Sequence, residues 1–173
     1  MRPVRDFLIP TAISLVVHVL ALGITALLWG QVIRSPALVN RSLVGQPIQI
    51  IQSYLATFDG AALMMAVFAV GVSFVASVIW FVRCLIAKRE VGRMWVNRAY
   101  WLVLLLIGWV AANWLAFGEL SSKSIPQLMD GSALVWHIVA FQIAFPLIFW
   151  IASILATPKA LRVAVFLAPL LPW

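Results

Sequence analysis

The sequence predicts an all-α membrane protein with four transmembrane helices. Four long stretches of the 173-residue chain contain no charged residue. The hydrocarbon core of a bilayer is about 30 Å thick and needs roughly 20 helical residues to cross. Because lipid offers the backbone no hydrogen-bond partners, apolar stretches of this length form helices. We place the spans at about residues 7–30, 60–82, 99–118 and 133–157.

The composition supports a single integral membrane bundle over residues 1–173. Hydrophobic residues make up 65% of the chain and charged residues only 10%, whereas soluble proteins carry about 25% charged residues. The net charge of +7 does not indicate nucleic-acid binding, because the basic residues follow membrane topology rather than one patch.

Basic residues in the connections predict the orientation, since cytoplasmic loops carry an excess of Lys and Arg. With a cytoplasmic N-terminus, only three basic residues lie outside: Arg34, Arg41 and Lys123. The others lie inside: Arg2, Arg5, Arg83, Lys88, Arg89, Arg93, Arg98, Lys159 and Arg162. We therefore expect an N-in, C-in protein of a bacterial inner (plasma) membrane.

The external segment, residues 31–59, is expected to hold an amphipathic helix between the first two spans. Pro47 suits the start of a helix, and apolar residues then recur at helical spacing: Ile48, Ile51, Leu55 and Phe58. Such a helix lies on the outer leaflet, packs on its own spans or meets a partner.

The cytoplasmic loop, residues 83–98, is strongly basic. Anionic lipid headgroups attract such a segment by about 1 kcal/mol per basic residue. The candidate contacts with anionic lipid or an acidic partner protein are Arg83, Lys88, Arg89, Arg93 and Arg98.

The chain after the fourth span, residues 158–173, is an apolar tail that is too short to cross a membrane. It can form an interfacial helix or a re-entrant piece, or dock on a neighbouring subunit. An exposed apolar tail is usually buried against another protein, which favours a chain that is a subunit of a complex.

Polar and small residues inside the spans are the candidate packing or partner faces, because polar groups are costly in lipid. Ala69, Ser73 and Ser77 form a small-residue ridge that lets another helix approach closely. Asn113 and Gln142 can hydrogen-bond across helices.

His18 lies near the middle of the first span, with Ser14 one turn earlier on the same face. A neutral imidazole at that depth needs a polar partner. No predicted span contains Asp or Glu, so a self-contained proton relay is not expected. A histidine that pairs with a neighbouring helix or subunit is the favoured interpretation.

The run from Ile13 to Leu20, preceded by Arg2 and Arg5, resembles the N-terminal anchor helix of the TonB and TolA energy transducers. Those anchors carry a Ser, three apolar residues and a His in one N-in span. The resemblance covers roughly the first 30 residues. It implies that Ser14 and His18 contact a proton-driven motor of the ExbB–ExbD or TolQ–TolR kind.

Catalytic and metal-binding signatures are not found: there is no H-E-x-x-H, carboxylate dyad or glycine-rich phosphate loop. His18 and His137 are expected at different depths and so do not share an ion. No enzyme activity, cofactor, metal, nucleic acid or small-molecule substrate is expected.

We expect a non-catalytic subunit or assembly factor of a larger envelope complex, for example a secretion or conjugation apparatus. Its partners would be the lipid bilayer and other membrane subunits or further copies of itself. One alternative is a homo-oligomeric pore or channel. A second is a component coupled to a proton-driven motor through the Ser14/His18 face.

Overall fold

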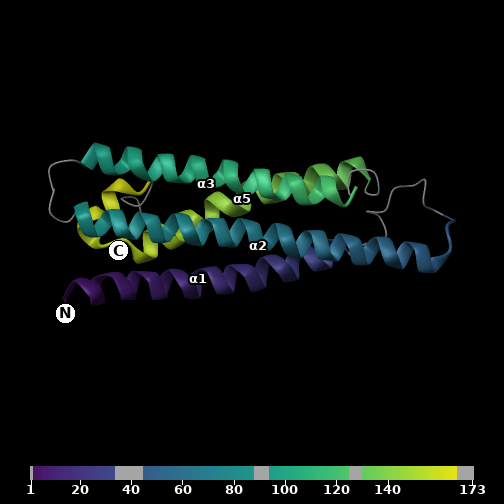
Figure 1. Ribbon diagram of the computed structural model, residues 1–173, viewed down its shortest axis with the longest axis horizontal. Helices are drawn as coiled ribbons and strands as arrows, with labels where there is room; N and C mark the ends of the chain where they lie inside the picture. The colour runs from purple at the N-terminus through teal and green to yellow at the C-terminus, as the bar shows by residue number, and fades with distance from the viewer. Residues whose placement is uncertain (1, 34–44, 88–93, 125–129, 167–173) are drawn as a thin grey trace.

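The computed structural model describes residues 2–33, 45–87, 94–124 and 130–166 (Figure 1). These residues form α1 (Arg2–Ile33), α2 (Ile48–Ala87), α3 (Met94–Ser122), α5 (Gly131–Ala156) and the 3-10 helix η3 (Lys159–Ala164). No strand occurs within these ranges. The 4 long helices are each long and apolar enough to cross a membrane, which confirms the prediction of an all-α fold with four helices of membrane-spanning length and composition.

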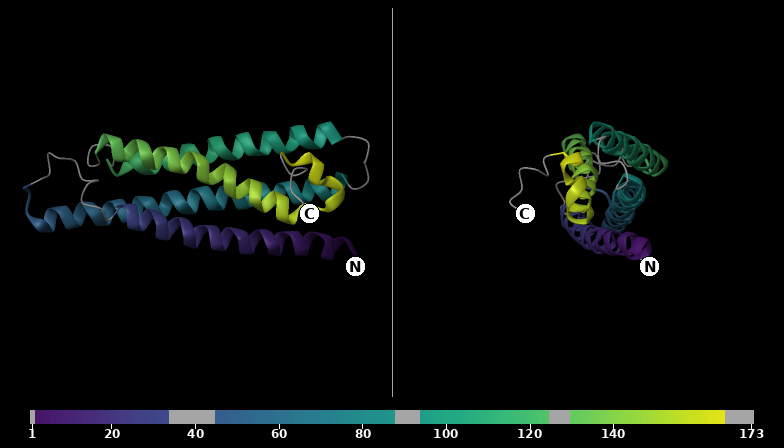
Figure 2. Two further views of the ribbon diagram at one scale, coloured as in Figure 1. Left: turned by 180° about the vertical axis from the view of Figure 1, so that it is seen from behind. Right: turned by 90° about the vertical axis from the view of Figure 1, so that its left-hand side faces the viewer.

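The four long helices lie roughly along one axis, as Figures 1 and 2 show. α2 is the central element, since it contacts α1, α3 and α5, while α5 also contacts α1 and α3. The start of α1 and η3 lie at the same end of the bundle (Figure 1). We call this end the basic end, because Arg83, Arg98 and Arg162 lie there.

α2 packs closely because the side chains at its contacts are small. Ala66, Ala69, Ser73 and Ser77 are fully buried and recur every three or four residues, so they share one face of the helix. Small side chains let the backbones of neighbouring helices approach and increase their van der Waals contact. The ridge expected at Ala69, Ser73 and Ser77 thus lies wholly inside the bundle.

The expected external amphipathic helix is not a separate element. Its residues form the first turns of α2, which runs without interruption for 40 residues. The carbonyl of Pro47 accepts the first bonds of this helix, from the N–H groups of Ile50 (2.9 Å) and Ile51 (3.3 Å). The expected boundary between residues 59 and 60 is not a helix end, because the charge of Asp59 does not interrupt helical hydrogen bonding. Phe58 is buried in the core of the bundle rather than placed on a leaflet.

The apolar tail is covered in part by its own bundle. Leu161, Ala164 and Val165 are buried at the basic end, whereas Val163 and Phe166 are exposed. The indole N–H of Trp150 donates to the carbonyl of Phe166 at 2.6 Å. The three buried residues therefore need no covering partner. Residues 167–173 lie outside the described ranges.

Gly108 allows α3 to pack against α5. A Cβ atom at this position would lie 2.5 Å from Cζ of Phe145. The Phe145 ring is fully buried and stacks on Phe149, with 6.3 Å between ring centroids. The ring therefore has little room to move away from an added methyl group.

We predict that Gly108→Ala destabilises the bundle by about 1–3 kcal/mol, the usual range for overpacking. Gly118→Ala on the same helix is the control, because nothing lies within 4 Å of its added Cβ. Denaturation in detergent, followed by circular dichroism, measures both variants. Gly108→Ala combined with Phe145→Leu should recover part of the loss. Equal stability of the two alanine variants would contradict this account.

Candidate functional site

His18 of α1 is buried against α2, where it contacts Ser73. The two atoms involved, His18 Nε2 and Ser73 Oγ, are 2.8 Å apart. His18 Nδ1 lies 2.6 Å from the main-chain oxygen of Ser14 and 3.3 Å from its hydroxyl. Phe74 adds an edge-on ring contact, with 5.4 Å between centroids. This cluster joins α1 to α2 in the interior of the bundle.

The partners fix the tautomer of the neutral His18 ring. A carbonyl oxygen only accepts hydrogen bonds, so Nδ1 must carry the proton that it shares with the Ser14 carbonyl. Nε2 is then an acceptor, and the Ser73 hydroxyl donates to it. Both ring nitrogens are satisfied within one chain, and no carboxylate takes part in the contacts that the described residues show.

Asn113 of α3 and Gln142 of α5 form a second polar contact between helices. The Asn113 side-chain amide donates to the carbonyl of Trp109 at 2.8 Å. This leaves Asn113 Oδ1 as the acceptor for Nε2 of Gln142, and the two atoms are hydrogen-bonded. The remaining oxygen of Gln142, Oε1, is buried without a partner among the described residues.

A third contact, between Trp80 of α2 and Thr157 just after α5, was not foreseen from the sequence. The indole N–H of Trp80 donates to Thr157 Oγ1 at 2.8 Å, and both side chains are buried. The sequence offers one hint of this contact: Thr157 is expected at a depth in the membrane similar to that of Trp80.

At the basic end, three arginines pair with neutral acceptors. Arg83 Nε donates to Asn97 Oδ1 at 3.2 Å, and Arg98 Nη2 donates to the Val163 carbonyl at 2.9 Å. Arg162 Nε donates to the carbonyl of Thr157 at 3.3 Å. Arg83 and Arg98 thus lie at the same end of the bundle, and their contact with anionic lipid or a partner stays a prediction. Lys88, Arg89 and Arg93 lie outside the described residues.

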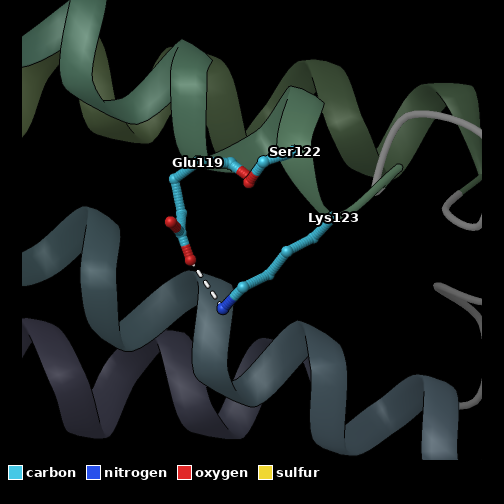
Figure 3. A network of polar contacts seen from close by, with 3 residues as sticks. All are labelled: Glu119, Ser122 and Lys123. Carbon is cyan, nitrogen blue, oxygen red and sulfur yellow. Dashed lines mark hydrogen bonds and ion pairs between the residues drawn. The ribbon is translucent and has the colours of Figure 1, made fainter.

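The opposite end carries charges of both signs. Lys123 and Glu119, at the end of α3, form an ion pair at 2.6 Å, and Ser122 donates to the Glu119 carbonyl (Figure 3). The Lys123 ammonium reaches over α2, where it lies 3.6 Å from the Cβ position of Gly60.

The spacing of the two charged ends matches a bilayer. At 1.5 Å per helical residue, Gly60 and Arg83 on α2 are about 35 Å apart, and Arg98 and Glu119 on α3 about 32 Å. The hydrocarbon core is about 30 Å thick. The His18–Ser73 contact and the Asn113–Gln142 contact both fall between these ends, within the spans.

The first turns of α2 extend beyond the mixed-charge end (Figure 1). Ile48–Thr57 precedes the level of Gly60 and Lys123, and we call it the α2 extension. Its tip is exposed: the side chain of Ile48 is 70% exposed, and Gln49, Gln52 and Ser53 are also exposed. The extension contains no charged residue.

The side of the bundle between α3 and α5 contains an apolar groove of about 580 Å³. Gln142 lines one part of the groove, and Trp101 and Trp150 line another. A smaller pocket of about 130 Å³ adjoins the same amide pair and is lined by both Asn113 and Gln142. Gln142 is therefore shared by the two cavities.

Within the described ranges, no group of three or more His, Cys, Asp or Glu residues is placed to hold a metal ion. His137, at the other end of the spans from the basic end, is buried.

Comparisons with known proteins found no family model that matches this chain, and no match among curated proteins or solved structures. The likeness of the first 30 residues to transducer anchor helices therefore stays a local resemblance. The function has to be argued from the contacts of this chain.

The His18–Ser73 contact predicts different effects for two serines on one face of α2. Ser73→Ala leaves His18 Nε2 buried without a donor, and we expect a loss of about 0.6–1.7 kcal/mol, the range for hydrogen bonds inside membranes. Ser77→Ala is the matched control, because Ser77 is equally buried but its hydroxyl has no partner in the described structure. Titration with denaturing detergent gives both unfolding free energies. Equal losses would show that the His18–Ser73 bond adds no stability.

Proposed function

We propose that this protein is a non-catalytic subunit or assembly factor of a larger membrane complex. The α2 extension carries the proposal. It is a helical continuation of the central span, it projects beyond the charged end of the bundle, and it presents apolar and neutral polar side chains to the surroundings. A surface of this kind suits docking onto another protein.

The polar contacts inside the spans support the same proposal. His18 pairs with Ser73, Asn113 with Gln142, and Trp80 with Thr157, so these side chains serve to hold helices together. A transport pathway usually needs an ionisable residue facing a water-filled cavity. The predicted spans contain no Asp or Glu, and their buried histidine His18 has protein partners on both ring nitrogens.

The orientation follows from the basic end. Arg83, Arg98 and Arg162 are best accommodated on the cytoplasmic side, where positive residues accumulate and anionic lipids attract them. The N-terminus and η3 then face the cytoplasm, and the α2 extension faces outward. Our proposal places the chain in a bacterial inner membrane, in an envelope machine such as a secretion or conjugation apparatus.

A double charge substitution, Ile48→Asp with Ile50→Asp, tests the docking surface. We expect the unmodified chain, extracted in mild detergent and affinity-captured, to retain a second membrane protein in fixed stoichiometry. The substituted chain should lose this protein while its own membrane level stays unchanged, because buried charges are costly at an interface. Ser121→Asp is the control: this exposed residue lies at the same end of the bundle but outside the extension. Retention of the partner by the Ile48/Ile50 variant would contradict the proposal.

Recovery of the chain alone, as a defined oligomer, would instead favour a homo-oligomeric pore. Conductance in vesicles that contain only this protein separates the two cases. A subunit of a larger machine should be silent, whereas a pore should conduct.

The proton-motor alternative requires the Ser14/His18 face to meet a partner that brings a membrane carboxylate. Because this face packs on α2, α1 would have to turn away from α2. A photoreactive residue at position 14 would then label the partner. Labelling confined to α2 would contradict this alternative.

A further inference from the structure

The groove between α3 and α5 differs from an ordinary lipid-facing surface in its hydrogen bonding. The carbonyl of Trp109 fixes the orientation of the Asn113 amide, and Asn113 in turn fixes that of Gln142. Gln142 Oε1 is therefore the atom left over, buried and without a donor among the described residues. A buried acceptor of this kind is normally satisfied by protein, water or a ligand.

Pro146 leaves a second acceptor at the same place, the main-chain carbonyl of Gln142. Proline has no N–H, so it cannot donate to the main-chain carbonyl of Gln142 four residues earlier. Pro146 also lines the groove, next to Gln142. The side-chain oxygen of Gln142 thus has no partner among the described residues, and its main-chain oxygen lacks the usual helical donor four residues later.

The rest of the groove selects for an uncharged, apolar body. Its lining between Gln142 and Trp150 is aliphatic or aromatic and includes no charged side chain. These two residues are about 12 Å apart along α5. Trp101, which is 2% exposed and stacks on Phe149, also lines the groove. The groove has a volume of about 580 Å³ and is open along much of its surface, as a site for a membrane lipid would be.

The depth of Gln142 suits the head of a lipid. Gln142 bonds to Asn113, which precedes Glu119 by about 9 Å along α3, so Gln142 lies about that far inside the mixed-charge end of the bundle. A hydroxyl group just below the headgroup layer would lie level with it. A phosphate would find no cation among the groove residues that the structure describes.

We propose that the α3–α5 groove binds a neutral lipid alcohol, whose hydroxyl group donates to Gln142 Oε1 and whose apolar body lies along Leu105, Pro146 and Leu147. This site is independent of the α2 extension. The protein also offers an internal comparison, because a second groove of about 580 Å³ on the outer face of α3 is lined only by apolar side chains.

Photolabelling of the full chain in neutral phosphatidylcholine vesicles tests the site. The probes are a photoreactive long-chain alcohol and its methyl ether, which keeps the oxygen but cannot donate. A neutral hydrogen bond is worth about 3- to 10-fold in binding. We expect the alcohol to label the α3–α5 groove about that much more strongly than the ether does, and the outer groove of α3 to label equally with both.

Three variants locate the effect. Gln142→Leu should reduce alcohol labelling of the groove to the level of the ether. Ile143→Trp should block the groove without changing Gln142, and Leu106→Trp in the outer groove should not; both residues are 59% exposed. Circular dichroism confirms that each variant is folded. Equal labelling of both grooves by both probes, or unchanged labelling in Gln142→Leu and Ile143→Trp, would reduce the site to annular lipid and overturn the proposal.

Discussion

Helices inside a bilayer gain nothing from leaving water when they associate, because lipid is as apolar as their own side chains. This bundle therefore depends on how closely its helices approach. The buried small side chains of α2 provide that approach, and α2 contacts every other long helix. Gly108 serves the same purpose on α3, where it meets the ring of Phe145.

Small residues bring helices together but specify register poorly, since one alanine resembles the next. The polar contacts supply the missing specificity. His18 bonds to Ser73 and not to Ser77 one turn away. Trp80 fixes α2 against the residue that follows α5. In lipid, a slip of one turn that set His18 beside Ala69, or that separated Trp80 from Thr157, would leave a polar group unpaired, so these contacts select one arrangement from several of similar packing.

Hydropathy and charge were enough to locate four membrane helices, because a span is recognised from the local composition of about 20 consecutive residues and does not depend on how the helices pack. They did not locate the ends of α2, since Asp59 interrupts the apolar run without interrupting helical hydrogen bonds. His18, Ser73, Asn113 and Gln142 could each be singled out as polar residues in lipid. Their pairing could not be predicted, because it depends on the depth and rotation of two helices at once.

The tail shows a different limit of sequence reasoning. Its apolar residues were taken to need a foreign cover, but Leu161, Ala164 and Val165 find one at the base of their own bundle. A short apolar segment after a proline carries no periodic pattern that says where it folds. Its position is set by contacts such as the Arg98–Val163 hydrogen bond, which brings α3 and η3 together.

The continuity of α2 has a mechanical consequence. α1 and α5 each contain an internal proline, whereas α2 contains none over its 40 residues, a length of about 60 Å. Kinks in helices usually arise at proline, so a tilt imposed on the outer tip of α2 cannot be absorbed at such a point along its length. The helix would act as a stiff lever, and displacement at one membrane surface would reappear, reversed in direction, at the other.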